Sequence, residues 1–302
     1  MAAVAVLVWG VTFVNTKALL VSFSALEIQV LRFAIAYAAL WAIRPSFDRV
    51  EKGDEKLFAL MGLAGVAVYQ LLENCAIHYT NASNVAILVS ICPVATALMV
   101  RAFGGGRRLS AMFFGGFAVA ISGVACVSLN GIREFHFRPA GDLMALAAML
   151  SWAVYSALVS KCAEKTYAQA FVIRRMFFWT LVFTAPVVAF GSTPLGRAVA
   201  DGSLAVTWDA AANAARFSDA MNWVNLGFLG VLASALCFVL WNAACGLLGV
   251  VRCTVGLYLV PVVTVAFAYV FLGEKMTALS ATGAALTLAG VVMSGWKRNR
   301  GA

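Results

Sequence analysis

Two stretches of the chain decide the fold: Cys-Pro-Val-Ala-Thr-Ala-Leu-Met-Val-Arg-Ala-Phe at residues 92–103 and Val-Pro-Val-Val-Thr-Val-Ala-Phe-Ala-Tyr-Val-Phe at residues 260–271. They lie 168 residues apart, and their alignment places Pro93 on Pro261 and Thr96 on Thr264. The chain contains only six prolines. Two Pro-Val-x-Thr strings in register therefore indicate an internal repeat.

The repeat extends well beyond these two strings. The offset of 168 also matches Asn74 with Asn242 and Gly115 with Gly283. A smaller offset of 143 matches Trp9 with Trp152 and Arg32 with Arg175. The difference of 25 residues falls in a connection at 191–221, which lies between two spans of the second half.

The composition is that of a membrane protein, because 63% of the residues are hydrophobic and only 12% are charged. A membrane helix needs roughly 20 apolar residues. Ten segments meet this requirement: 2–22, 25–44, 57–78, 83–103, 110–130, 141–161, 168–190, 222–245, 251–272 and 279–296. We therefore expect an all-α membrane protein with ten transmembrane helices.

The ten segments divide into two groups of five, residues 1–131 and residues 141–297. A group with an odd number of spans inserts in opposite orientations in the two halves. The sequence thus predicts two inverted five-helix repeats, an arrangement that is typical of secondary transporters.

Lysine and arginine counts predict the orientation, since the cytoplasmic side holds the excess. With the N-terminus inside, thirteen basic residues lie in cytoplasmic connections, and the opposite side holds five: Arg133, Arg138, Arg197, Arg216 and Lys275. We expect both termini to be cytoplasmic in a multi-pass protein of the cell (inner) membrane. The same scatter of basic residues through short connections explains the net charge of +9 without nucleic acid.

Several other chemistries find no support in the residues. The seven cysteines lie in or beside apolar segments and are interpreted as small core side chains, not disulfide partners or metal ligands. Neither His78 nor His136 has a metal-ligand pattern around it. Gly104-Gly-Gly106 lacks the Lys-Ser/Thr ending of a phosphate-binding loop. We expect no metal, no cofactor and no ATP hydrolysis.

Four short motifs resemble the EamA type of the drug/metabolite transporter superfamily: Trp9-Gly-Val-Thr-Phe13, Leu31-Arg32-Phe33, Asn81-Ala-Ser-Asn-Val85 and Gly273-Glu274-Lys275. The resemblance covers the whole chain. It implies export of an amino acid or another small metabolite through a cavity between the two halves. One departure is Gly104-Gly-Gly-Arg-Arg108, where such repeats carry Gly-Glu, so any structural role of that glutamate rests on Glu274 alone.

Polar side chains inside spans are functional candidates because they are costly in lipid. Lys17 and Glu73 share a depth in two spans of the same direction, a position from which they can pair. The alternatives are a structural ion pair, a lysine that extends to the outer interface, and a proton-coupling site with Glu73 as the carrier.

A second group of candidates combines depth with polar or aromatic chemistry. A midplane substrate site is expected from Gln70, Asn74, Trp152, Tyr155, Trp241, Asn242 and Tyr258. Amide groups between aromatic walls suit a zwitterionic amino acid with an apolar side chain. The alternative is that the asparagines join neighbouring helices and that the rings pack.

Four repeated residues complete the candidates. Arg32 and Arg175 lie off the midplane and either anchor helix ends or loop carbonyls, or bind an anionic group. Pro93 and Pro261 lie within spans and are expected to bend or break them by removing a backbone hydrogen bond, either as static kinks or as bends that permit rocking.

These residues together predict a secondary transporter, expected to export a small organic metabolite by alternating access and driven by the substrate gradient or by protons. Its expected partners are the small-molecule substrate and the lipid bilayer; the sequence names no protein partner. The rivals are a non-transporting membrane scaffold or sensor and a lipid-modifying membrane enzyme. The enzyme would need clustered histidines or carboxylates at a membrane surface, which the sequence lacks.

Overall fold

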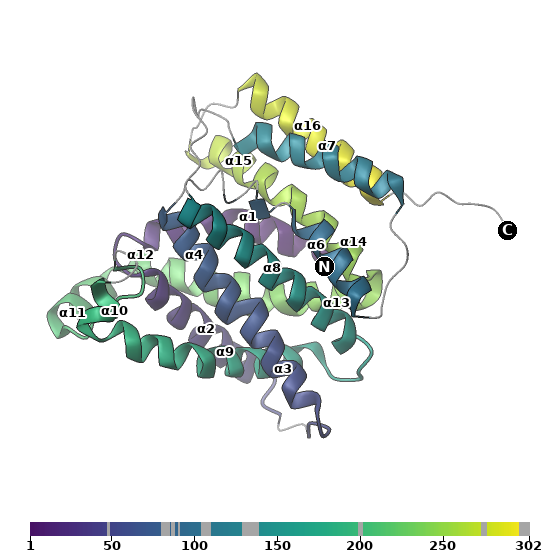
Figure 1. Cartoon of the computed structure of the whole chain (residues 1–302). Helices are drawn as coiled ribbons and strands as arrows, with labels where there is room; N and C mark the ends of the chain where they lie inside the picture. Colours follow the sequence, from purple (N-terminus) through teal and green to yellow (C-terminus); the bar gives the residue numbers. More distant parts are fainter. Residues whose placement is uncertain are drawn as a thin grey trace.

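The computed structural model describes residues 1–46, 49–79, 85, 88–89, 91–103, 110–128, 139–198, 202–272 and 277–295, and within these ranges the regular elements are helices (Figure 1). The first half contains α1 (Ala2–Leu19), α2 (Ala25–Ile43), α3 (Asp54–Gly62), η1 (Leu63–Val68), α4 (Tyr69–Tyr79), α6 (Cys92–Ala102) and α7 (Ala111–Ser128). The second half contains α8 (Pro139–Cys162), α9 (Gln169–Gly191), α10 (Pro194–Ala198), α11 (Ala210–Ser218), α12 (Ala220–Gly227), η3 (Phe228–Leu236), α13 (Cys237–Leu248), α14 (Val250–Val255), η4 (Gly256–Tyr258), α15 (Leu259–Leu272) and α16 (Ala278–Gly295).

Within the described ranges, five helical stretches are long and apolar enough to cross a membrane: Ala25–Ile43, Asp54–Ala76, Pro139–Cys162, Gln169–Gly191 and Ala220–Leu248. Shorter apolar helices occupy the other five predicted spans. Large apolar side chains such as Leu7, Leu143 and Leu247 point outward, with 56%, 64% and 77% of their surface exposed. An exposed apolar surface of this kind fits lipid and not water.

The third span of each half contains a π-helical stretch, η1 in one and η3 in the other. Moving Leu63–Val68 by the repeat offset places it inside η3, so the two stretches are repeat-related. A π-helix shifts the backbone bonding by one residue and leaves carbonyls open to other donors. In η1 and the residue before it, Thr180 bonds to the carbonyl of Gly62 (3.2 Å) and Ser151 to that of Ala64 (2.7 Å).

Local chemistry fixes where two of the helices meet their connections. Ser24 and Glu27 form a capping box at the start of α2, with bonds of 3.1 and 2.9 Å between each side chain and the other residue's backbone N–H. Gly249 ends α13 and precedes α14 at φ 87°, a conformation that favours glycine. A tight turn between the two spans follows.

The helices α7 and α16 lie side by side and form a pair at one side of the bundle (Figure 1). Their backbones approach so closely that a Cβ added to Gly123 would lie 2.4 Å from the Thr287 nitrogen, and one added to Gly290 would lie 2.3 Å from the Ala120 nitrogen. Small residues allow such packing where lipid offers no hydrophobic driving force between helices.

The helix contacts recur when the two halves are exchanged. The pair α1 and α15 corresponds to α8 and α6, and α2 with η3 corresponds to α9 with η1. Likewise, α1 with α13 corresponds to α8 with α4, while α2 with α9 and α7 with α16 correspond to themselves. The contacts therefore follow the sequence repeat.

The prolines lie where the fourth and ninth predicted spans are irregular. Pro93 lies in the first turn of α6, and residues 88–89 before it are helical as well. Pro261 lies in the first turn of α15 directly after the 3₁₀ turn η4, within the apolar helical stretch Val250–Thr264. Their expected role as bends of these spans stays a prediction.

The connection at 191–221 is also more ordered than a loop. It contains the short helices α10 and α11, and the side chain of Asp209 caps α11 by accepting from Ala212 N (2.7 Å). Apolar periodicity did not reveal α11 because none of its residues is buried.

Candidate substrate site

A cluster of aromatic side chains occupies the interior between the halves. The ring centroid of Trp9 on α1 lies 5.9 Å from that of Trp152 on α8 and 5.1 Å from that of Trp241 on α13. Phe238 joins the cluster 6.2 Å from Trp152. Trp152 and Trp241 are 6% and 1% exposed, so the rings are packed against one another.

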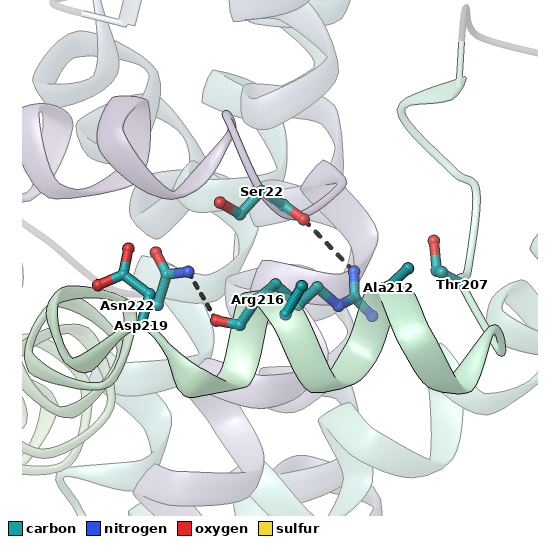
Figure 2. A pocket seen from close by; sticks show the side chains of 7 residues that line it. Ser22, Thr207, Ala212, Arg216, Asp219 and Asn222 are labelled. Carbon is teal, nitrogen blue, oxygen red and sulfur yellow. Dashed lines mark hydrogen bonds between the residues drawn. The ribbon is translucent and has the colours of Figure 1, made fainter.

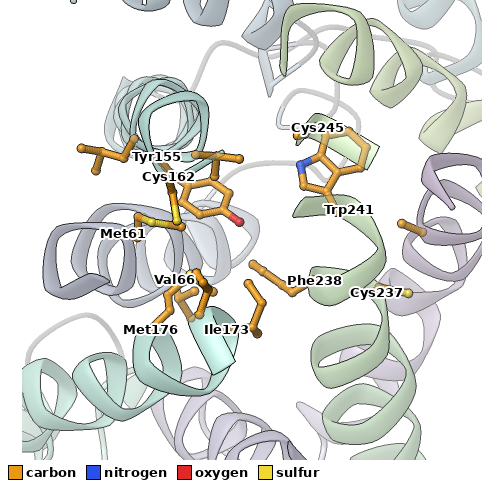
Figure 3. Packing of buried hydrophobic residues seen from close by; sticks show 14 of the residues in the cluster. Met61, Val66, Tyr155, Cys162, Ile173, Met176, Cys237, Phe238, Trp241 and Cys245 are labelled. Carbon is orange, nitrogen blue, oxygen red and sulfur yellow. The ribbon is translucent and has the colours of Figure 1, made fainter. Parts of the chain in front are cut away.

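Tyr155 and Asn242 extend this cluster with a direct hydrogen bond between α8 and α13 of the second half. The Asn242 side-chain amide donates to the Tyr155 hydroxyl (2.7 Å) and to the backbone carbonyl of Phe238 (2.9 Å). Figure 3 shows the Tyr155 hydroxyl directed toward α13, which carries Trp241 and Phe238. Tyr155 and Asn242, two of the residues expected at the substrate site, are thus in direct contact.

A buried polar network adjoins the aromatic cluster. Arg32 donates from Nε to the Ser234 hydroxyl (2.6 Å) and from Nη1 to Gln70 Oε1 (3.4 Å). Gln70 Nε2 donates to Glu73 Oε2 (2.8 Å), and the Tyr69 hydroxyl donates to Glu73 Oε1 (2.6 Å). The network therefore runs from η3 through α2 to α4.

Arg32 is expected either to anchor helix ends or loop carbonyls or to bind an anionic group. Its guanidinium bonds to Ser234, which lies near the middle of the 29-residue stretch Ala220–Leu248, and the binding of an anionic group stays a prediction. The available signal for this candidate was an arginine in an apolar helix. Arg175, the repeat-related residue, pairs with Glu55 (2.6 Å). Arg174, which precedes it on α9, binds the backbone carbonyls of Arg44 and Ser46.

Two expected residues are placed differently from the rest. Tyr258 lies in a separate apolar cluster with Ala97 and Phe113, and its hydroxyl has no partner among the described residues. Asn74 is buried, with 5% of its surface exposed, one residue beyond Glu73 on α4. The side chain of Lys17 lies outside the described part of the structure, so its expected contact with Glu73 stays a prediction.

Two pockets lie at opposite ends of the bundle. One, of about 360 Å³, is lined by Ser22, Thr207, Ala212, Ala215, Arg216, Asp219 and Asn222, and Figure 2 shows Arg216 reaching from α11 to Ser22. The other, of about 430 Å³, is lined by Leu57, Val100, Phe103, Ala157, Ser160, Lys161, Glu164 and Lys165. The network and the rings lie between them, so the two ends are separated by packed side chains.

Comparisons with known proteins agree with this architecture. The model of the EamA-like transporter family matches residues 1–129 and again residues 139–296. A solved crystal structure with 19% identity superposes with a TM-score of 0.74, covering 97% of this chain and 94% of the other. That likeness shows the fold.

Two named relatives carry a function in their names. A protein of Streptantibioticus cattleyicolor, "Probable terminal-alkyne amino-acid exporter", is 30% identical over 90% of this chain and 82% of its own. A protein of Escherichia coli, "Probable amino-acid metabolite efflux pump", is 26% identical over 97% of this chain and 93% of its own. The chain therefore belongs to the EamA-like transporter family and is an integral membrane transporter, not an enzyme.

Proposed function

We propose that this transporter exports a small amino-acid-like metabolite across a bacterial inner membrane by alternating access, with both termini in the cytoplasm. The observation that carries the proposal is the position of the polar network and the aromatic cluster. They combine side chains of α1, α2 and α4 with side chains of α8, η3 and α13. A site shared by two halves is one on which both halves can close.

The two halves, residues 1–131 and 141–297, are proposed to be inverted five-span repeats. The recurrence of helix pairs and of the π-helical stretches supports this division. The two matches of the family model support it as well. Ten spans and opposite insertion of the halves complete the proposal.

The proposed substrate site comprises Gln70, Asn74, Trp152, Tyr155, Trp241 and Asn242, with Tyr258 next to the interruption before α15. The named relatives support an amino acid as substrate. The first turns at Pro93 and Pro261 are proposed as the points about which the fourth and ninth spans move.

Glu73 is the proposed proton carrier. Its carboxylate is 8% exposed and accepts bonds from Tyr69 and Gln70. A carboxylate buried among neutral donors is sensitive to the loss or gain of one proton. Lys17 stays the proposed cationic neighbour, and Arg32 is a second one on the same network.

The test begins with metabolite profiles of culture medium from cells that overproduce the protein, which identify the exported compound. Purified protein in proteoliposomes should then accumulate that compound under an imposed pH gradient. Glu73→Gln should abolish accumulation under the pH gradient, because the amide can neither carry a charge nor release a proton. Glu55→Gln, a carboxylate outside the network, is the matched control and should behave as wild type.

Accumulation by Glu73→Gln against the gradient would contradict proton coupling at this residue. Unchanged medium profiles together with inactive proteoliposomes would favour the scaffold or sensor instead.

A further inference from the structure

The cation of Arg32 is buried, and no carboxylate among the described residues bonds to it directly. Its side chain is 6% exposed, and its two bonds go to the neutral oxygens of Ser234 and Gln70. Among the described residues, no acceptor is bonded to Nη2. A guanidinium at membrane depth is costly without an anion, so Arg32 retains donor capacity for one.

The opposite charge lies one side chain away. Gln70 presents its oxygen to Arg32 and its nitrogen to Glu73, with distances of 3.4 and 2.8 Å. The amide thereby holds apart two buried opposite charges. The Gln70 amide also contacts both charged side chains directly.

We propose that an α-amino-acid zwitterion binds here, with its carboxylate on Arg32 and its ammonium on Glu73, and that it displaces the Gln70 amide. The inference rests on the proposed function and specifies its site. A zwitterion carries both charges on one carbon and neutralises both protein charges at once. Its side chain would meet the Trp152 ring, whose centroid lies 4.9 Å from that of Tyr69.

The two poles can be tested separately with three probes: L-phenylalanine, L-phenylalaninamide, which lacks the carboxylate, and N-acetyl-L-phenylalanine, which lacks the ammonium. Binding is measured on purified protein in lipid nanodiscs. Wild type should bind phenylalanine at least tenfold more tightly than either analogue. Arg32→Gln should lose at least tenfold affinity for phenylalanine and none for the amide. Arg175→Gln, the repeat-related arginine paired with Glu55, should change neither affinity.

Gln70→Ala separates displacement from direct binding. Because Gln70 competes with the zwitterion for both charges, Gln70→Ala should raise phenylalanine affinity; a tenfold loss would overturn the displacement. Ser234→Ala keeps the test valid if Arg32→Gln fails to fold, since it removes the hydroxyl that orients the Arg32 guanidinium and should weaken phenylalanine selectively. Equal loss of affinity for all three probes in these variants would overturn the site. So would failure of the wild type to bind any probe while it still exports its substrate, and in that case the proposed transport would stand. Binding without transport would instead contradict the proposed function.

A second, independent inference concerns two tryptophans at equivalent positions of the repeat. The Trp9 indole donates to the carbonyl of Ala233 in η3 (2.8 Å). The offsets of 143 and 168 map this pair onto Trp152 and Gly65 of η1. The Trp152 indole nitrogen is buried, yet it has no partner among the described residues.

The neighbours of Trp152 on α8 already contact the backbone of η1. Ser151 bonds to the carbonyl of Ala64, the residue before Gly65 (2.7 Å). The Tyr155 ring lies against Gly65, where an added Cβ would be 2.3 Å from Cδ2. The indole of Trp9 in the first half thus makes its hydrogen bond to η3, whereas the equivalent bond from the indole of Trp152 to η1 is not formed.

We infer that the two bonds alternate during transport: in the opposite access state Trp152 donates to the Gly65 carbonyl and Trp9 releases Ala233. Inverted repeats exchange their conformations between the two states. Phenylalanine at either position keeps an apolar ring but removes the donor. Because one hydrogen bond contributes about 1 kcal/mol, each change should alter the ratio of the states about fivefold.

Pulsed electron paramagnetic resonance in lipid nanodiscs can measure the width of each end of the bundle as a distance between two spin labels. One preparation carries labels at Ser22 and Ala212, and a second carries them at Leu57 and Lys161. The preparations use a background without the native cysteines that still transports. Trp9→Phe should depopulate the state described here, and Trp152→Phe should enrich it. Trp208→Phe, at a residue that is 66% exposed, is the control and should leave the distances unchanged. Shifts in the same direction for both variants, or no shift in either, would overturn the exchange.

Discussion

Arg216 binds both carboxylate oxygens of Glu27, with distances of 2.8 and 2.9 Å, and thereby joins α11 to the first turn of α2. The two side chains are 12% and 7% exposed. Glu27 also accepts from the Thr207 backbone N–H (2.8 Å) and caps its own helix. One carboxylate thus holds together a connection that the sequence presents as a loop.

Replacing Arg216 by glutamine should therefore destabilise the fold substantially. Removal of one partner from a buried ion pair costs about 3–5 kcal/mol, while an exposed pair contributes about 0–1 kcal/mol. Arg175→Gln, whose pair with Glu55 is 35% and 30% exposed, is the matched comparison. Thermal unfolding in detergent should show the larger loss for Arg216→Gln, and equal losses would contradict this role.

The packing of α7 against α16 makes a second prediction. Gly123→Ala should lower the unfolding temperature, because its Cβ would overlap the Thr287 backbone at 2.4 Å. Gly115→Ala on the same helix has no atom within 4 Å and should be tolerated. If both variants unfold at the same temperature as wild type, the close approach of the helices is not needed for stability.

Alkaline pH should weaken one contact between α3 and the connection after α8. The Asp54 carboxylate, 3.0 Å from Lys165, raises the pKa of Lys165 above its usual value of 10.5. A raised pKa means that this contribution to stability is present below pH 10.5 and is lost as the pH rises through the folded value. Unfolding temperatures of wild type and Lys165→Met should differ at pH 8 and converge once the pH exceeds the raised pKa of Lys165; a constant difference would show that packing, not charge, is involved.

Reporter fusions test the orientation. Gly53 and Gly106 should give a cytoplasmic signal, whereas Gly131 and Gly202 should give an external one, as the thirteen-to-five excess of basic residues predicts. A cytoplasmic signal at Gly202 would change the parity of the second half and contradict inverted repeats.

The sequence predicts the helical spans well because apolar length is a strong signal, as at 141–161 against α8 (Pro139–Cys162). It predicts η1 and η3 poorly, since a π-helical stretch leaves the apolar composition of its span unchanged. For the candidate site, depth and repeat select Trp152, Tyr155 and Asn242, which the structure places in contact, and their role in substrate binding stays a prediction. The sequence does not predict that Arg32 meets Ser234, because depth along one helix does not say which neighbour the side chain will meet.

The two halves carry different side chains at equivalent positions of the candidate site. The offset of 168 places Gln70 on Phe238 and Glu73 on Trp241, so one half carries the amide and the acid where the other carries two rings. A symmetric pair of identical halves would hold two carboxylates or two tryptophans at these positions, and neither combination gives one polar wall facing one aromatic wall. The difference between the two halves at these positions is thus what makes the interior chemically two-sided.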